Sequence, residues 1–164
     1  FRVGNKSALA ESNVWLDPEA AQAVLDCNIP FTFVTLDATH SAYVTMEDAA
    51  RFRAIGTRPA EVVASLCEQR IAGYGEWQKV ADVPAAPVHD PLTIAYLVDP
   101  TVITDIEDAP CVVDCGRGAA YGVTLFDIRN GRAEAKAPNC RVALKADREK
   151  YVDILCRLLE NTKK

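Results

Sequence analysis

The feature that most restricts the fold is an alternation of capped helices with short apolar strands. Residues 17–25 combine an aspartate at the capping position, a proline at the first helical position and an alanine-rich run, so they predict a helix. Residues 31–36 are β-branched and aromatic and predict a strand, which opens into a loop at residues 37–40. Helices and strands that alternate along 164 residues predict one α/β domain, because a chain of this length buries a single core.

The rest of the chain continues this alternation. Helical patterns cover residues 45–52, 59–72, 90–98 and 148–159, and strand patterns cover residues 111–114, 120–127 and 140–144. We expect the last three strands to be antiparallel, residues 82–87 to form a proline-rich loop and the helix at 90–98 to be buried. The strand at 31–36 has no earlier parallel partner and would lie at an open edge. The predicted class is α/β with a mixed sheet that forms part of a larger fold.

Composition and charge argue against several classes of function. The formal net charge is −5 and the Lys and Arg residues are scattered, so we expect no nucleic-acid partner. No apolar run approaches the roughly 20 residues that span a membrane, so we expect no membrane partner. The six cysteines form no CxxC pair, which argues against zinc and favours buried thiols in a reducing, cytoplasmic compartment. The chain begins at Phe1 without a methionine, as a fragment or a processed chain would.

Polar side chains gather where two of the predicted helices begin. His89 and Asp90 stand side by side at the start of one helix, and Asn5, Glu11 and Asn13 precede the helix at 17–25. Carboxamides and carboxylates are good ligands for a hydroxylated, uncharged molecule. By itself, however, Asp90 is equally explained as a helix cap and His89 as a bystander.

Five short motifs, taken in order, resemble the C-terminal half of the inosine–uridine-type nucleoside hydrolases. They are Gly4-Asn5, Glu11-x-Asn13, Asp17-Pro18-Glu19-Ala20-Ala21, Leu36-Asp37-x-Thr39-His40 and Pro87-x-His89-Asp90-Pro91-Leu92. The resemblance covers most of residues 4–160 and implies the C-terminal portion of an open, Rossmann-like fold. It also implies hydrolysis of the N-glycosidic bond of ribonucleosides to ribose and free base, as in purine and pyrimidine salvage. The family's N-terminal motif, Asp-x-Asp-Pro-Gly-x-Asp-Asp, does not occur in this sequence.

The resemblance assigns roles to individual residues around a bound Ca²⁺, which takes six to eight oxygen ligands. Asp90 matches a calcium ligand of the family, and His89 matches the histidine that lines the base side of the pocket and serves catalysis. Asn13 matches an asparagine that binds the ribose hydroxyls. Glu11 and Asn5 match groups at the 5′-hydroxyl end of the sugar.

Other positions match the family less closely. Tyr74 and Trp77 lie where the family has a mobile base-covering segment, so either could stack on the base or be an ordinary aromatic residue. We expect His40 to be structural. Ser12 stands where the family usually has an aromatic residue, and residues 120–122 read Ala-Tyr-Gly in place of Thr-Arg-Gly. The second difference leaves any role of that arginine open.

The leading hypothesis is that residues 1–164 form the C-terminal part of a calcium-dependent nucleoside hydrolase. Its partners would be the ribonucleoside substrate, the N-terminal half of the same fold and, once complete, further copies in a homo-oligomer. The isolated chain would be inactive, because the aspartate motif is absent. Two alternatives remain, namely a non-catalytic nucleoside- or sugar-binding module and a remnant that serves only in assembly.

Overall fold

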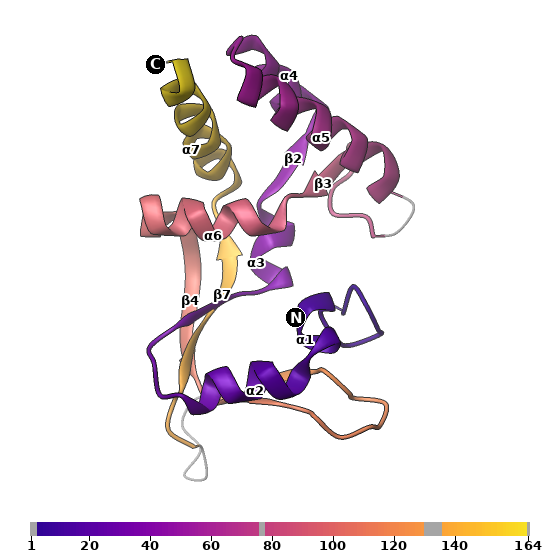
Figure 1. The fold of residues 1–164 in the computed structure, drawn as a ribbon, viewed down its shortest axis with the longest axis vertical. Coiled ribbons are helices and arrows are strands. Elements are labelled where there is room, and N and C mark those ends of the chain that lie inside the picture. Colours follow the sequence, from indigo (N-terminus) through magenta and orange to yellow (C-terminus); the bar gives the residue numbers. More distant parts are fainter. Residues whose placement is uncertain (1–2, 76–77, 130–135, 164) are drawn as a thin grey trace. The chain divides into compact units, whose positions relative to one another are not determined.

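The computed structural model describes residues 3–75, 78–129 and 136–163 (Figure 1). The chain divides into two compact units, each made of two segments. The first unit consists of residues 1–36 and 105–144, and the second of residues 37–104 and 145–164. Within the described ranges, no helix is both long enough and apolar enough to cross a membrane.

The first unit begins with two helices, α1 (Ser12–Leu16) and α2 (Pro18–Asp26). Asp17 caps α2, because its side chain accepts a hydrogen bond from the backbone N–H of Ala20 at 2.9 Å. Pro18 occupies the first turn, where a backbone N–H has no partner within the helix, so the missing N–H of proline costs no hydrogen bond. The predicted helix is therefore confirmed, with its predicted cap.

The strands of the first unit form two sheets. In one, β1 (Thr32–Val34), β7 (Cys140–Ala146) and β4 (Ile103–Ala109) lie in the order β1-β7-β4. Strand β1 pairs with β7 in parallel, and among the described strands β7 is its one neighbour, which is the edge position expected. In the other, β5 (Cys111–Val113) and β6 (Thr124–Phe126) pair antiparallel. The buried residues of the core between α2 and these strands are Leu25, Cys111, Val113 and Cys140.

Two predictions for these strands were wrong. Strand β7 was expected to continue an antiparallel meander after β5 and β6, but it pairs in parallel with β1 instead. Strand β4 was not predicted at all, because acidic residues at 105, 107 and 108 break its apolar alternation. The first error arises because the pairing of distant strands is decided by packing that local sequence does not express.

The second unit is mainly helical. Its elements are α3 (Leu36–Ser41), β2 (Tyr43–Thr45), α4 (Met46–Ala54), α5 (Arg58–Tyr74), β3 (Ala85–Pro87), α6 (His89–Val98), η1 (Pro100–Val102), α7 (Arg148–Glu160) and η2 (Asn161–Lys163). Helices α4 and α5 pack side by side (Figure 1). The largest side chains with no exposed surface include Phe52, Leu92, Tyr151 and Ile154. The helices at 46–54, 58–74, 89–98 and 148–160 confirm the predicted helical segments.

Three details of the second unit differ from expectation. The predicted loop after β1 is helix α3, and Thr39 and His40 are buried in it. The predicted proline-rich loop contains β3, which pairs antiparallel with β2 and places Ala86 opposite Val44. Helix α6 buries Leu92 but leaves Leu97 76% exposed, so it is half-buried rather than buried. All six cysteines are free thiols. Cys67, Cys111 and Cys140 are buried as expected, whereas Cys115 and Cys156 are half-buried and Cys27 is exposed.

Candidate functional site

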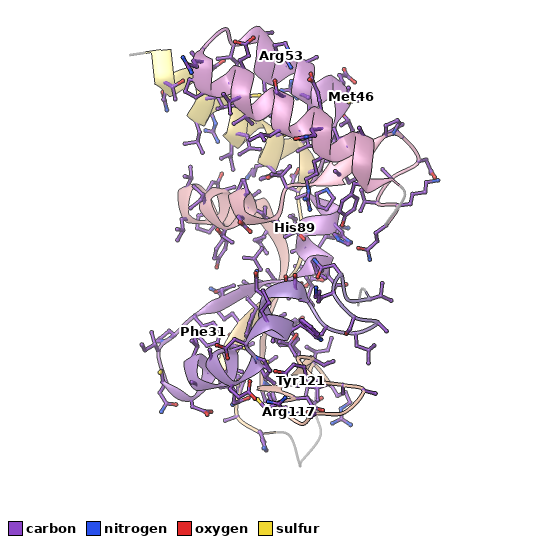
Figure 2. The ribbon with its side chains drawn as sticks, turned by 45° about the vertical axis from the view of Figure 1, so that its right-hand side comes forward. Phe31, Met46, Arg53, His89, Arg117 and Tyr121 are labelled. Atoms are coloured by element: carbon purple, nitrogen blue, oxygen red, sulfur yellow. The ribbon has the colours of Figure 1, made fainter. Side chains whose placement is uncertain are left out.

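His89 opens helix α6 in the second unit (Figure 2). The helix starts here because β3 ends at Pro87 and Val88 keeps an extended backbone. The Nδ1 atom of the His89 ring lies 2.8 Å from Oγ1 of Thr39 in α3. The Nε2 atom is buried and has no hydrogen-bond partner among the described residues. One side of the ring is therefore held, and the other presents an unused polar atom.

His40 lies beside His89 and is 1% exposed. The centroids of the two imidazole rings are 5.8 Å apart, and the ring planes are inclined at 42°. The Nε2 atom of His40 lies 3.2 Å from the hydroxyl of Tyr74 at the end of α5. Because Thr39 and His40 are adjacent in α3, one short helix touches the His89 ring through both residues.

Arg70 connects α5 to the strand that precedes His89. Its guanidinium group lies 5.1 Å from the centroid of the Tyr74 ring, within the range of a cation–π interaction. Its Nε donates a hydrogen bond to the carbonyl oxygen of Pro87 at 2.7 Å. The start of α6 is thus tied to the same helix that supplies Tyr74.

Burial, the positive charge of Arg70 and the neighbouring His40 together lower the pKa of His89 to about 4, with burial the largest cause, while Asp90 opposes the shift. His89 is therefore a neutral imidazole near neutral pH, with one nitrogen that donates and one that accepts. Burial also raises the pKa of Tyr74, so its hydroxyl remains protonated. His89 and Tyr74 are therefore both uncharged near neutral pH.

Asp90 occupies the second position of α6 and is exposed. Its backbone carbonyl accepts a hydrogen bond from Oγ1 of Thr93 at 2.7 Å, but its carboxylate bonds to none of the described residues. The capping position belongs to Val88, which provides no side-chain bond. The carboxylate is therefore available to a ligand. No group of three or more His, Cys, Asp or Glu side chains able to hold a metal ion occurs in the described part of the chain.

The other predicted residues form a tight turn in the first unit. Oδ1 of Asn5 accepts a hydrogen bond from the N–H of Ser12 at 2.9 Å. Glu11 caps α1, because its Oε2 accepts bonds from the N–H groups of Asn13 at 2.7 Å and Val14 at 3.2 Å. The turn needs glycine at its start, since a Cβ on Gly4 would lie 2.3 Å from the carbonyl oxygen of Ala10.

The same turn leaves several polar atoms unused. Nδ2 of Asn5, Oε1 of Glu11 and the whole carboxamide of Asn13 bond to none of the residues that the structure describes. Asn5 and Asn13 are exposed and Glu11 is half-buried. The three residues therefore stand together as a preformed set of donors and acceptors.

Trp15 and Tyr121 pack beside this turn. Their contact with each other was not predicted from the sequence. Their rings meet edge to face, with centroids 6.3 Å apart. Gly122 has a φ of +76°, and a Cβ there would lie 2.7 Å from Cα of Trp15. Tyr121, labelled in Figure 2, thus packs against α1 where the family's Thr-Arg-Gly sequence has an arginine.

The structure groups the predicted site residues within the two units. His89 lies near Tyr74 in the second unit, and Asn5, Glu11 and Asn13 lie together in the first. The predicted residue Trp77 lies outside the described residues. Sequence reasoning missed Thr39, although it belongs to the Leu36-Asp37-x-Thr39-His40 motif, which was the available signal.

Comparisons with known proteins agree with one another. The family model described as inosine-uridine preferring nucleoside hydrolase matches residues 1–153. The pyrimidine-specific ribonucleoside hydrolase RihA of Escherichia fergusonii is 37% identical over 158 residues, which are 96% of this chain and 49% of that protein. RihA of Escherichia coli K12 has the same identity and coverage.

Solved structures show the same similarity. A plant nucleoside hydrolase superposes with a TM-score of 0.80 and 26% identity, over 96% of this chain and 50% of that one. A purine-preferring ribonucleoside hydrolase from Gardnerella vaginalis superposes with a TM-score of 0.78 and 26% identity, over 97% and 50%. The chain therefore spans about half the length of the relatives that it matches.

Proposed function

Because the chain belongs to the inosine-uridine preferring nucleoside hydrolase family, we propose that it supplies about half of an enzyme that hydrolyses the N-glycosidic bond of ribonucleosides to ribose and free base. The observation that carries this proposal is the half-buried, neutral His89, whose buried Nε2 has no partner among the described residues, next to the exposed Asp90 carboxylate. The histidine suits an uncharged heterocycle, and the carboxylate suits a hard cation.

On the base side, His89 would bond to the leaving base. A buried polar atom without a partner destabilises the protein by about 1–3 kcal/mol, and a ring nitrogen or carbonyl oxygen of the base would offset this. Because the imidazole is neutral, it can donate one hydrogen bond without carrying charge into the pocket. Tyr74 and Trp77 would then stack on or cover the base.

On the ribose side, Asn13 would bind the hydroxyl groups, and Glu11 and Asn5 the 5′-hydroxyl end. The free carboxamide of Asn13 and the unused atoms of Glu11 and Asn5 support this assignment. Binding of remote parts of the sugar positions its anomeric carbon for attack. The turn keeps its shape without ligand, so little ordering would accompany binding.

Asp90 would hold Ca²⁺. Its hard oxygen donors fit the preference of calcium, and its carboxylate bonds to none of the described residues. When bound, the metal would lower the pKa of a water molecule and hold the ribose diol. One carboxylate cannot complete a shell of six to eight oxygens. The remaining ligands would come from a segment that carries the family's aspartate motif.

The remaining parts of the proposal concern the setting of the enzyme. It would serve purine and pyrimidine salvage in the cytoplasm, and the complete enzyme would form a homo-oligomer. The free state of all six cysteines supports a reducing compartment.

The test is release of ribose from uridine and inosine by the full-length protein, measured as reducing sugar, with calorimetric binding of the same nucleosides in parallel. We expect ribose release from at least one of the two. Binding without release would favour the second candidate, a non-catalytic nucleoside-binding module. That candidate is favoured by the lack of any metal-binding cluster in the described residues. If the protein neither binds these nucleosides nor releases ribose from them, both candidate functions are overturned.

A further inference from the structure

We propose that Thr39 and His40 are positioning residues, which hold the His89 ring so that its Nε2 faces the leaving base. The inference rests on the proposed function, because it gives His89 a task that requires a fixed ring. It concerns residues that the resemblance left without a chemical role. Three features hold the ring: the contact of Thr39 with Nδ1, the His40 ring beside the plane of the His89 ring, and the Tyr74 hydroxyl that holds His40 in turn.

The first step is the bond between Thr39 and His89. A rotation of about 180° about the last torsion of an imidazole exchanges Nδ1 with Cδ2 and Nε2 with Cε1, so it turns a carbon to each place where a nitrogen stood. The Oγ1 atom of Thr39, in a residue only 4% exposed, lies 2.8 Å from Nδ1. Rotation of the ring would give up this bond in a place that water does not reach. The contact therefore selects one ring orientation and leaves Nε2 for the substrate.

The second step is the position of the ring plane. His40 is buried and its ring lies 5.8 Å from that of His89 at an inclination of 42°, so it limits the tilt of the His89 ring from one side. The Tyr74 hydroxyl, 3.2 Å from Nε2 of His40, keeps the His40 ring from turning. A misplacement of about 1 Å can lower an enzyme's rate by about 100-fold, so such support has a direct effect on turnover.

The third step is the anchor of Tyr74 itself. Arg70 covers the Tyr74 ring at 5.1 Å and bonds to the carbonyl oxygen of Pro87, two residues before His89. The contacts therefore run from α5 through Tyr74 and His40 to the His89 ring, and also from α5 through Arg70 to the backbone that begins α6. Both paths act on the same residue. A core serving stability alone gains more from apolar side chains than from a buried imidazole, a half-buried one and a hydroxyl.

The experiment compares two substrates in the full-length protein. Uridine has a base that leaves more easily when a hydrogen bond or proton reaches it, whereas p-nitrophenyl β-D-ribofuranoside releases a phenolate that needs neither. The variants are Thr39→Val, which removes the hydroxyl but keeps the shape, and Thr39→Ser, which restores the hydroxyl. Thr124→Val is the control, since the Thr124 hydroxyl in β6 bonds to none of the described residues.

We expect Thr39→Val to lower kcat for uridine about tenfold, the effect of one lost hydrogen bond in the transition state, with KM changed less than about twofold. Its rate on the aryl riboside should stay within about twofold of the wild type. Thr39→Ser and Thr124→Val should behave as the wild type on both substrates. His40→Phe should, like Thr39→Val, lose activity on uridine while its rate on the aryl riboside changes little.

Several outcomes would overturn the inference. Equal losses on both substrates in Thr39→Val would reduce Thr39 to a structural residue, and no loss on either would remove its role. A wild type that hydrolyses neither riboside would overturn the proposed function, and this inference with it.

Discussion

At the scale of single residues, two neighbours at the start of α6 have opposite surroundings. His89 is half-buried, held by Thr39 and His40, and has a pKa lowered to about 4, whereas Asp90 is exposed and its carboxylate bonds to none of the described residues. Side chains that are adjacent in sequence point in different directions on a helix. The pair can therefore serve two separate parts of one substrate complex, a heterocycle and a cation.

This separation predicts different losses in the full-length protein. Asp90→Ala should abolish calcium retention and lower turnover more than about 100-fold, because a lost metal ligand has no substitute nearby. His89→Ala should lower turnover about 100-fold while calcium stays bound. Metal analysis after dialysis and ribose release measure the two effects. Asp105→Ala is the matched control, an exposed aspartate in β4. Equal calcium content in Asp90→Ala and the wild type would remove the metal role.

A second residue-scale prediction separates two asparagines of the turn. Asn13→Ala should raise KM for the nucleoside and leave the melting temperature unchanged, because the Asn13 carboxamide makes no bond in the described structure. Asn5→Ala should also lower stability by about 1 kcal/mol, because Oδ1 of Asn5 accepts the bond from Ser12. Calorimetry and steady-state kinetics on both variants test this. Equal melting temperatures for the two variants would contradict it.

The sequence motifs located the residues of the site, but not their contacts. His89, Asp90, Asn5, Glu11 and Asn13 stand in motifs that a single sequence displays. The bond between Thr39 and His89 joins residues 50 positions apart, and no local pattern expresses such a contact. The contacts of His40, which is expected to be structural, likewise become visible only in the fold.

At the scale of elements, prediction succeeded where a segment was long and capped. Helices α4 and α7 were predicted from caps and periodicity, and the capping box between Thr45 and Asp48 is present. Strands β2 and β3 have three residues each and show no periodicity, so they were missed. Helix α3 was taken for a loop, because its six residues include Asp37 and Thr39, which are common in turns.

The buried carboxylate of Asp48 links α4 to α7, and this predicts a large effect on stability. Its Oδ2 accepts bonds from the N–H and hydroxyl groups of Thr45 at 2.9 and 2.8 Å, and Arg148 donates to the same oxygen. The Arg148 guanidinium also lies 4.9 Å from the centroid of the Tyr43 ring. Asp48→Ala should lower the free energy of unfolding by about 3 kcal/mol, because it leaves Arg148 without its partner in a largely buried place.

The matched control for this prediction is the exposed ion pair between Arg51 and Asp153. Its atoms are 2.8 Å apart, but the side chains are 44% and 61% exposed. Asp153→Ala should therefore change stability by less than about 1 kcal/mol. Urea unfolding of both variants gives the comparison. Similar losses in the two would show that burial does not strengthen the Asp48 link.

At the scale of the whole molecule, the chain shows the fold of its family. The α/β class and the nucleoside-hydrolase fold were predicted from motif order and are confirmed. Strand β1 lies at an edge among the described strands, as expected. Large apolar side chains are also exposed, including Leu16 at 69% and Ile29 at 65% in the first unit and Leu97 at 76% in the second. Apolar surface of this extent is typical of faces that another segment covers.

The last prediction concerns the 164-residue polypeptide alone. It should release no measurable ribose from uridine or inosine and should associate as its concentration rises, because one carboxylate cannot fill a calcium shell and its apolar surface lacks a cover. Adding a separate polypeptide that carries the aspartate motif of a family member should restore turnover and reduce the association. Light scattering and ribose release measure both. Full turnover by a verified monomer of 164 residues would show that the chain completes the site by itself. It would refute the proposal that a second segment supplies the remaining calcium ligands.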